Sequence, residues 1–199
     1  MSTILYLCRH GNTFESNEVP VQVGAKTDLP LTTFGLQQGQ KLGQFFATVG
    51  PVSHIFSGPL KRQMQTASEI QNALPDVEMS VATYLSEIDY GPWEGLTSDA
   101  IAENWKAAYE LWNTKHIWPE NLFPEPKSAY IDRLNAFLAE IKTHYPDQTV
   151  IAVTSNGLLQ LLHHLISNEE KAAKVKTGYW CKIIIDENQI SVAAWNESP

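Results

Sequence analysis

Near the start of the chain lies the run Thr3-Ile4-Leu5-Tyr6-Leu7-Cys8, followed directly by Arg9-His10-Gly11. The first six residues are apolar or favour extended backbone, a composition typical of a strand that is buried on both faces. Such a strand belongs to a parallel sheet between two layers of helices. The polar tripeptide then lies at the carboxyl end of the strand, where ligands bind in open α/β sheets.

Strand and helix patterns alternate beyond this run. Thr32 is a good helix N-cap, and apolar residues from Leu42 to Val49 recur at helical spacing until Gly50-Pro51. The later elements are a strand over 52–56, a helix with Pro59 in its first turn, a helix over 130–141, a strand over 149–153, a helix over 158–166 and a hairpin over 181–194. This alternation predicts an α/β fold of three layers, with a mostly parallel sheet and helices on both faces.

Length and composition indicate one folded domain. A chain of 199 residues has the size of a single domain, and we assign residues 1–199 to it. Hydrophobic residues make up 43% and charged residues 18%, which excludes a disordered or fibrous chain. Residues 98–126 are less regular, because tryptophans and a proline-rich stretch interrupt the pattern. We expect a helix there, followed by an irregular, lid-like excursion.

Charge and cysteine content limit the partners and the location. Asp and Glu number 22 against 14 Lys and Arg, a net charge of -8, which argues against nucleic acid because phosphate neutralisation needs clustered basic residues. A small phosphorylated metabolite needs only one or two well-placed arginines. Apolar runs are too short to cross a membrane, no export signal is visible, and two cysteines cannot build a disulfide framework or a four-cysteine zinc site. We therefore predict a cytoplasmic protein without a metal or other cofactor; the pattern leaves its oligomeric state open.

Polar residues follow three of the predicted strands. They are Arg9-His10-Gly11, then Ser57-Gly58 with Arg62 beyond, and Ser155-Asn156-Gly157. The fork of an arginine suits phosphoryl oxygens, a histidine can be a nucleophile near neutral pH, and a glycine lets a backbone N–H approach a ligand. Taken singly, each motif also fits an ordinary strand end with solvated charges. Together they predict an anion site at one edge of the sheet.

A further motif combines acids with a loop, in the order Glu87-Ile88-Asp89-Tyr90-Gly91-Pro92-Trp93. If Glu87 is partly desolvated, it holds a proton near neutral pH and can donate it to a leaving alcohol. A solvated surface carboxylate is the competing interpretation. Trp105 and Trp112 are interpreted as packing residues, whereas Trp93 and Trp118 fit either the core or a substrate pocket.

In this combination the motifs resemble the histidine phosphatase superfamily, also called phosphoglycerate mutase-like. Leu7-Cys8-Arg9-His10-Gly11 is similar to its signature, residues 57–67 to its second arginine motif, and Glu87 with residues 91–95 to its acid loop. Residues 28–32 with Gly35 resemble the segment that leads into its first helix. The resemblance runs in order from about residue 4 to residue 160.

The resemblance implies a metal-independent phosphomonoester hydrolase that forms a phosphohistidine on His10. Arg9 and Arg62 would hold the non-bridging oxygens, and Glu87 would protonate the leaving oxygen and then help to activate water. The residues expected to bind the substrate are Gly11, Thr13, Ser16 or the neighbouring Asn17, and Trp93. The substrate itself stays open among sugar phosphates, nucleotides, ribazole phosphate and phosphoproteins.

One departure from the family concerns its second histidine, which normally follows a later strand in a Ser/Ala-His-Gly pattern. A gapless match puts Ser155 at that position, and an offset of one residue puts Asn156 there; neither can be a cation. Losing one such donor costs roughly 2.7–4 kcal/mol in transition-state stabilisation. His116, in the excursion, could reach the phosphate instead, whereas His163 and His164 lie too far along the next helix.

Because of this departure, two alternatives to the hydrolase stay open. One is a catalytically weakened phosphate-binding or regulatory protein on the same fold. The other is a phosphomutase, although the family's glycolytic mutases are longer than this chain.

Overall fold

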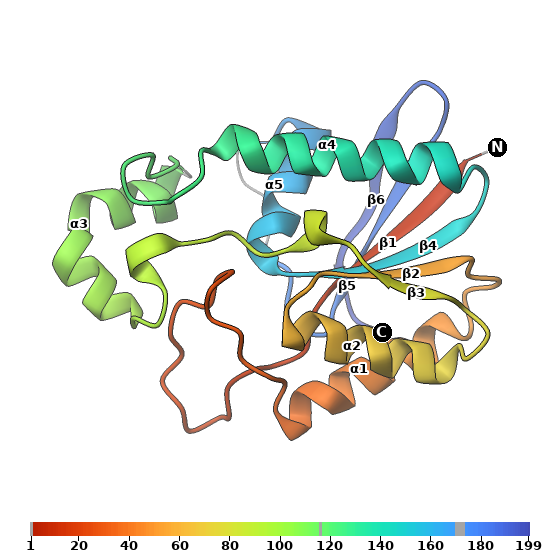
Figure 1. Cartoon of the computed structure of the whole chain (residues 1–199), viewed down its shortest axis with the longest axis horizontal. Helices are drawn as coiled ribbons and strands as arrows, with labels where there is room; N and C mark the ends of the chain where they lie inside the picture. Colours follow the sequence, from red (N-terminus) through yellow and green to blue (C-terminus); the bar gives the residue numbers. More distant parts are fainter. Residues whose placement is uncertain (1, 116, 170–173) are drawn as a thin grey trace.

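The computed structural model describes residues 2–115, 117–169 and 174–199. Strands of this described part form a six-stranded sheet in the order β3-β2-β4-β1-β5-β6 (Figure 1). The strands are β1 (Thr3–Arg9), β2 (His54–Ser57), β3 (Met79–Val81), β4 (Thr149–Thr154), β5 (Trp180–Ile185) and β6 (Ile190–Glu197). The β1–β4, β4–β2 and β2–β3 pairs are parallel, and β5 is antiparallel to both β1 and β6. The predicted fold class is confirmed, and the closing hairpin makes the sheet mixed.

Helices cover both faces of this sheet. They are α1 (Thr33–Phe46), α2 (Lys61–Ala73), α3 (Ser98–Lys115), α4 (Lys127–His144) and α5 (Asn156–Ser167), with short 3-10 turns at Thr83–Leu85 and Gly91–Trp93. In Figure 1, α1 and α2 lie on one side of the sheet, and α4 and α5 lie on the other. Residues of β1 alternate between the two layers: Leu5 and Leu7 belong to one buried cluster, and Tyr6 and Cys8 to the other. The continuous apolar run of β1 is therefore required by burial on both faces.

Helix starts follow local capping chemistry, with one correction. The Thr32 hydroxyl accepts the Gly35 N–H at 3.0 Å, so α1 begins where the N-cap signal predicts. In α2 the N-cap is Leu60 and the helix begins at Lys61. The sequence pattern predicts Pro59 in the first turn of this helix. Pro59 instead lies ahead of the helix, before its N-cap.

Helix α3 and the segment over 117–126 lie beside the layered body. α3 is bent at Trp105, where the backbone is not helical (φ -135°, ψ 43°), and in Figure 1 it stands apart from the sheet. The segment after it packs aromatic side chains inward, because Trp118 and Phe123 are both buried. Arg133 of α4 forms an ion pair with Glu125, which attaches this segment to the body of the protein.

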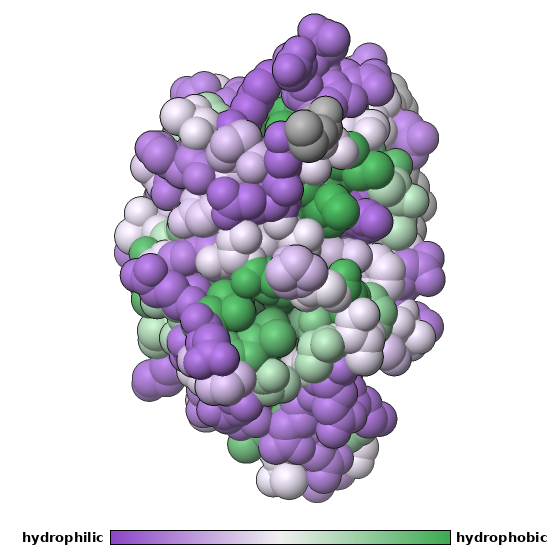
Figure 2. Space-filling model, turned by 90° about the vertical axis from the view of Figure 1, so that its right-hand side faces the viewer, coloured by the Kyte–Doolittle hydropathy of each residue, from purple (hydrophilic) through white to green (hydrophobic). Residues whose placement is uncertain are grey.

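The opposite end of the molecule faces the viewer in Figure 2. Hydrophobic side chains there form an area surrounded by hydrophilic ones. None of the described helices is long and apolar enough to span a membrane. The cysteines Cys8 and Cys181 are buried and free, and they belong to different hydrophobic clusters.

Candidate active site

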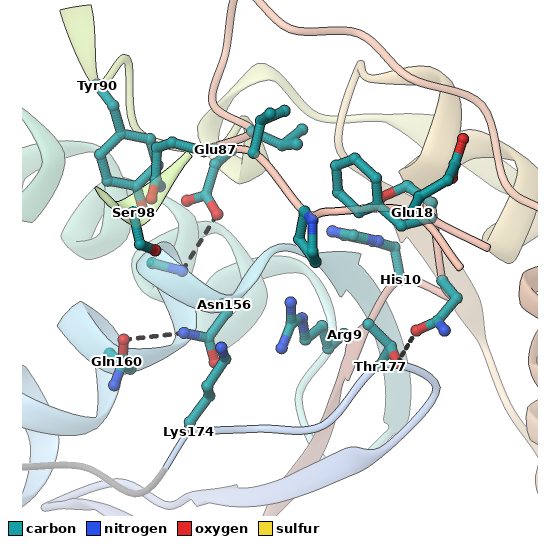
Figure 3. A pocket seen from close by; sticks show the side chains of 18 of the residues that line it. Arg9, His10, Glu18, Glu87, Tyr90, Ser98, Asn156, Gln160, Lys174 and Thr177 are labelled. Atoms are coloured by element: carbon teal, nitrogen blue, oxygen red, sulfur yellow. Dashed lines mark hydrogen bonds between the residues drawn. The ribbon is translucent and has the colours of Figure 1, made fainter. Parts of the chain in front are cut away.

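A cleft of about 1160 Å³ lies at the carboxyl ends of the parallel strands. Its walls come from the end of β1, the loop over 12–23, the acid loop near Glu87, α3, the start of α5 and the segment over 174–177 (Figure 3). Arg9, His10, Glu87 and Asn156 all line this cleft. Residues that are far apart in the sequence therefore meet in one place.

His10 lies at the inner end of this cleft and is 6% exposed. Its Nδ1 is 2.8 Å from the Gly11 carbonyl oxygen, and its Nε2 is 3.2 Å from Nε of Arg62. A carbonyl only accepts and a guanidinium only donates, so these two contacts place the ring proton on Nδ1. Burial, together with the charges of Arg62 and Arg9, lowers the pKa of His10 well below its usual value. The ring is therefore neutral at pH 7, and its Nε2 lone pair accepts the Arg62 Nε–H.

Arg62 is fully buried behind His10. Besides the bond to His10, it donates to the carbonyl oxygens of Thr27 at 3.0 Å and Gly24 at 3.1 Å. These carbonyls hold the plane of the guanidinium without neutralising its charge. A phosphoryl oxygen at His10 would therefore meet a positive group that is already oriented.

Glu94 in turn holds the loop that carries these two carbonyls. Its carboxylate accepts the Lys26 N–H at 3.0 Å, the Thr27 hydroxyl at 2.7 Å and the Tyr90 N–H at 3.2 Å. One carboxylate thus joins the loop over 24–27 to the acid loop. The position of Arg62 depends on this connection.

Arg9 approaches His10 from the end of β1. Its Nη1 donates to the Val175 carbonyl oxygen at 2.7 Å. Its Nε is buried and has no hydrogen-bond partner among the described residues. A buried N–H without a partner is costly, and an oxyanion in the cleft would remove that cost.

Glu87 provides the carboxyl group of the site and is 5% exposed. One oxygen accepts the Ile88 N–H at 2.9 Å and the other accepts the Gly157 N–H at 3.2 Å. Burial raises the pKa of Glu87, although the Ile88 N–H and the charge of Arg62 oppose this effect. The prediction that this acid is desolvated agrees with its burial.

Gly157 is required by a close approach of three side chains. A Cβ atom at this position would lie 2.3 Å from the Tyr90 hydroxyl, 2.6 Å from a Glu87 oxygen and 2.8 Å from the Ile88 side chain. Any larger residue must displace the carboxyl group. Burial and the nearby Glu87 raise the pKa of Tyr90 well above its usual value, so its hydroxyl stays protonated beside the acid.

The structure distinguishes Ser155 from Asn156. Ser155 is the N-cap of α5, is fully buried, and its hydroxyl accepts an N–H from the Gln63 side chain at 2.9 Å. Asn156 is the first residue of the helix and lines the cleft. Its Nδ2 donates to Gln160 at 2.9 Å, and its Oδ1 accepts the Val175 N–H at 3.0 Å. Of the two side chains, only that of Asn156 lines the cleft, although the gapless match favours Ser155.

The expected substrate-binding residues divide into two groups. Thr13 and Ser16 line the cleft, whereas the neighbouring Asn17 is not part of its lining. The Gly11 N–H is already used by Thr66 at 3.0 Å, and a Cβ on Gly11 would lie 2.3 Å from the Gly35 carbonyl oxygen. A glycine is therefore required at this position by backbone packing, and its N–H is already bonded within the protein.

Trp93 and His163 lie in the packed interior and not in the cleft. Trp93 is 1% exposed and packs edge-on against Phe123 at 5.0 Å, so it lies in the core behind the cleft. His163 is buried and packs against Trp195 at 4.5 Å, as a packing role predicts. His116 lies outside the described residues.

Several residues of the cleft gave no recognisable signal in the sequence. They are Tyr90, Tyr109, Trp112, Lys174 and Thr177. Trp112 was interpreted as a packing residue, and it both packs against Phe123 at 5.4 Å and lines the cleft. Tyr90 follows Glu87 closely and could have been included with the acid loop; Lys174 belongs to no motif. Within the described part of the chain, no group of three or more His, Cys, Asp or Glu side chains is placed to hold a metal ion.

The fold and the site define a class of protein. It is an α/β protein in which a buried neutral histidine meets two arginines and a protonatable carboxyl group at the sheet edge, an arrangement suited to phosphoryl transfer. A sequence model of the histidine phosphatase superfamily (branch 1) matches residues 5–198. The chain therefore belongs to the histidine phosphatase superfamily.

Known proteins similar to this chain include phosphatases. The chain is 30% identical over 164 residues to the uncharacterized phosphatase PhoE of Bacillus subtilis. This alignment covers 80% of this chain and 75% of that protein. The chain is also 26% identical over 200 residues to the adenosylcobalamin/alpha-ribazole phosphatase of Escherichia coli, and this alignment covers 96% of this chain and 95% of that protein. The native structure of a mycobacterial glucosyl-3-phosphoglycerate phosphatase has the same fold, with a TM-score of 0.85 at 22% identity. The superposition covers 98% of this chain and 99% of that structure. The prediction of a phosphatase of this family is confirmed at this level.

Proposed function

We propose that the chain hydrolyses small phosphomonoesters through a phosphohistidine on His10. The observation that carries this proposal is the neutral imidazole whose Nε2 lone pair faces Arg62 at 3.2 Å in a buried site. The reaction uses side chains of a single domain, residues 1–199, and needs no metal or other cofactor. We also propose a cytoplasmic location, where both buried cysteines would stay reduced.

In the first step Nε2 of His10 attacks phosphorus, a P–N bond forms and the P–O bond to the alcohol breaks. In the free protein the Arg62 Nε–H donates to the His10 Nε2 lone pair. When this lone pair forms the P–N bond, the Nε–H becomes available to a phosphoryl oxygen. Arg9 Nε, buried without a partner, binds a second oxygen. Protonated Glu87 gives its proton to the leaving alcohol, which the raised pKa of this carboxyl group favours.

In the second step water attacks phosphorus on the phosphohistidine and the P–N bond breaks. Glu87, now ionised, accepts the proton of that water and returns to its starting state. Asn156 faces the same cleft and offers the phosphoryl group a neutral amide in place of the family's second histidine. A neutral donor stabilises a developing charge less than a cation does, so we expect slow but measurable turnover.

The excursion over 98–126 acts as a lid in this proposal. Tyr109, Trp112 and Asn113 of α3 line the cleft on the side away from the sheet. They contact the alcohol part of the substrate and keep water away from the leaving group until the alcohol departs.

The test is direct trapping of the intermediate. Wild-type protein and His10→Ala are mixed with p-nitrophenyl phosphate, quenched in base, digested and analysed by mass spectrometry for phosphate on the peptide that contains His10. We expect an acid-labile phosphate and turnover in the wild type and neither in the variant. His144→Ala, which removes an exposed histidine of α4, is the matched control and should behave as the wild type.

Two outcomes would overturn the proposal. One is full turnover in His10→Ala. The other is tight binding of phosphate or vanadate by the wild type, by calorimetry, without any turnover over a panel of phosphorylated metabolites. The second outcome would establish the phosphate-binding alternative instead.

A further inference from the structure

A buried side-chain amide lies behind the site and joins three elements. Gln63 follows Arg62 in the first turn of α2, is fully buried and does not line the cleft. Its Oε1 accepts the Leu60 N–H at 3.1 Å. Its Nε2 donates to the Leu85 carbonyl oxygen and to the Ser155 hydroxyl, each at 2.9 Å. The amide oxygen and both amide N–H groups are therefore used within the protein.

The three partners of Gln63 belong to the elements that carry the groups of the site. Leu60 is the N-cap of α2, whose first turn contains the buried arginine. Leu85 ends the 3-10 turn over 83–85, two residues before Glu87. Ser155 is the N-cap of α5, two residues before Gly157. One amide therefore sets the spacing between the start of α2, the acid loop and the start of α5.

The surroundings of Gln63 restrict its movement. A Cβ atom on Gly58 would lie 2.1 Å from Gln63 Oε1 and 2.6 Å from the Leu85 carbonyl oxygen, so the backbone approaches this amide closely. The Leu85 carbonyl oxygen also accepts the Thr154 hydroxyl at 2.8 Å. Helix α2 and strand β4 thus hold the same carbonyl group. A buried polar network whose members are all bonded defines one arrangement of its elements.

The serine at the start of α5 is held by Gln63 and not by its own helix. An N-cap serine or threonine usually accepts an N–H from the first turn, as Thr32 does in α1. Ser155 makes no such bond, and its hydroxyl accepts from Gln63. The Gly157 N–H in this first turn donates to Glu87 at 3.2 Å, and a dashed line in Figure 3 joins the Glu87 carboxyl group to the start of α5.

We propose that Gln63 is a positioning residue that holds the acid loop against the start of α5, so that Glu87 keeps its bond to the Gly157 N–H. Gln63 does not line the cleft and therefore acts through Leu85 and Ser155. This inference rests on the proposed function for the role of Glu87 as proton donor, and it adds what keeps that donor in place. A donor held in one position can reach the leaving oxygen without reorganisation.

The test measures the pKa of Glu87 directly, by carbon NMR of protein labelled at the glutamate carboxyl groups. Glu87→Gln identifies the resonance. The charged and titratable groups that act on Glu87 are Arg62, Arg9 and Tyr90, and the test changes none of them.

Gln63→Met keeps the length of the side chain and removes its three hydrogen bonds. The Gly157 N–H lowers the pKa of Glu87, so weakening this bond should raise that pKa. We also expect kcat for p-nitrophenyl phosphate to fall about tenfold and KM to change less than about twofold, since the change affects the proton donor and not the arginines. An unchanged or lowered pKa of Glu87 would overturn the proposal even if the variant melts at a lower temperature, because Gln63 would then contribute to stability alone.

Ser155→Ala is a second variant, and it removes only one of the three bonds of Gln63. It should raise the pKa of Glu87 less than Gln63→Met does, and it carries the test if Gln63→Met does not fold; no rise would then overturn the proposal. The double variant should match Gln63→Met, because the bond between the two residues is already absent there. A shift equal to the sum of the two single shifts would mean that the residues act independently, which contradicts the proposal.

Gln71→Met is the matched control. Gln71 lies on the same helix, and its Nε2 donates to the Val77 carbonyl oxygen at 3.1 Å, away from the acid loop. This variant also loses a hydrogen bond from a glutamine to a carbonyl oxygen, but it should leave the pKa of Glu87 and kcat unchanged. A shift as large as that of Gln63→Met would show that any loosening of α2 has this effect, and the proposal would fail.

A failure of the proposed function is separable from a failure of the positioning role, because the NMR titration needs no turnover. If the wild type does not hydrolyse p-nitrophenyl phosphate but Gln63→Met raises the pKa of Glu87, the hydrolase proposal fails and the positioning role stands. If the wild type hydrolyses this substrate and the pKa does not rise, only the positioning role fails.

Discussion

The inner and outer ends of the cleft are built on different principles. At the inner end, His10, Arg62 and Glu87 are each at most 6% exposed and are held by hydrogen bonds to backbone atoms of neighbouring loops. At the outer end, Glu18, Asn113 and Lys174 are exposed and come from the loop over 12–23, from α3 and from the segment before β5. In the proposed function the chemistry therefore depends on buried groups held in place by hydrogen bonds, and the choice of substrate depends on exposed segments that can vary without disturbing them.

This difference also explains where charge is placed. The inner end contains the fully buried Arg62, the partly buried Arg9 and a carboxyl group whose pKa is raised, so its groups are oriented before a substrate arrives. Orienting dipoles and charges in advance avoids reorganisation during the reaction. The outer end carries charges of both signs in contact with water, where each one contributes less.

The largest effect should come from Arg62→Lys at the inner end. A lysine cannot bind the Thr27 and Gly24 carbonyls and His10 together, because it lacks the planar fork of the guanidinium. We expect kcat to fall about 10³-fold, with the fold retained by circular dichroism. Lys61→Ala, which removes the adjacent exposed charge, should change kcat less than twofold, because exposed charges contribute little energy. A loss below tenfold in Arg62→Lys would contradict the role of this end.

Next in size is Glu87→Gln, which removes the proton donor. We expect kcat to fall by about 10² or more and the alkaline limb of the pH profile of kcat to disappear. Stability provides a second readout. Because the pKa of Glu87 is raised on folding, this group destabilises the protein as pH rises from the usual value near 4.5 through the raised one. Relative to the wild type, the melting temperature of the variant should therefore increase between pH 4.5 and pH 7, and a constant difference would count against a buried acid.

A third prediction concerns the boundary between the two ends, at the position of the missing histidine. Asn156→His places a second imidazole in the cleft and should raise kcat about tenfold. This gain is smaller than the loss in kcat that removing one transition-state donor causes, roughly 10²–10³-fold. Ser155→His should instead destabilise the protein by about 1–3 kcal/mol, because this position is fully buried and bonded to Gln63. Turnover and thermal melting measured on both variants separate these effects. A gain in Ser155→His would return the assignment to the gapless match.

The smallest effect is expected at the outer end, in Asn113→Ala. This exposed side chain lines the cleft, so its loss should raise KM roughly twofold and leave kcat unchanged, as expected for one neutral hydrogen bond. Asn104→Ala, on the same helix but outside the cleft, is the control and should change neither constant. A fall in kcat would show that α3 acts on the chemical step and that the two ends are not independent.

Much of the inner end could be predicted because its residues follow strands in recognisable motifs. Arg9 and His10 come directly after an apolar strand, Arg62 begins a helix, and Glu87 precedes a glycine and proline loop. The carboxyl ends of parallel strands meet at one edge of a sheet, so local patterns were enough to bring these groups together. The closing hairpin was predicted from its own local pattern, but the order of the strands was not, since pairing depends on contacts between distant segments.

Errors occurred where a side chain's direction mattered more than its type. Trp93 and Trp112 are the same residue type in the same region, yet Trp93 is buried and Trp112 lines the cleft. Their environment is set by the packing of Phe123 and neighbouring rings, which no local pattern encodes.

By itself the sequence determined the three-layer α/β class, the residues proposed to be catalytic at the inner end and the absence of a histidine directly after β4, because each depends on composition and local order. Only the tertiary structure decided that Asn156 and not Ser155 faces the cleft, since the N-cap geometry of α5 turns the serine inward to Gln63. It alone placed Lys174 beside Arg9, although the two are 165 positions apart (174 minus 9). The physical reason is the same in both cases: the direction of a side chain and its long-range neighbours are fixed by packing and hydrogen bonds between distant segments.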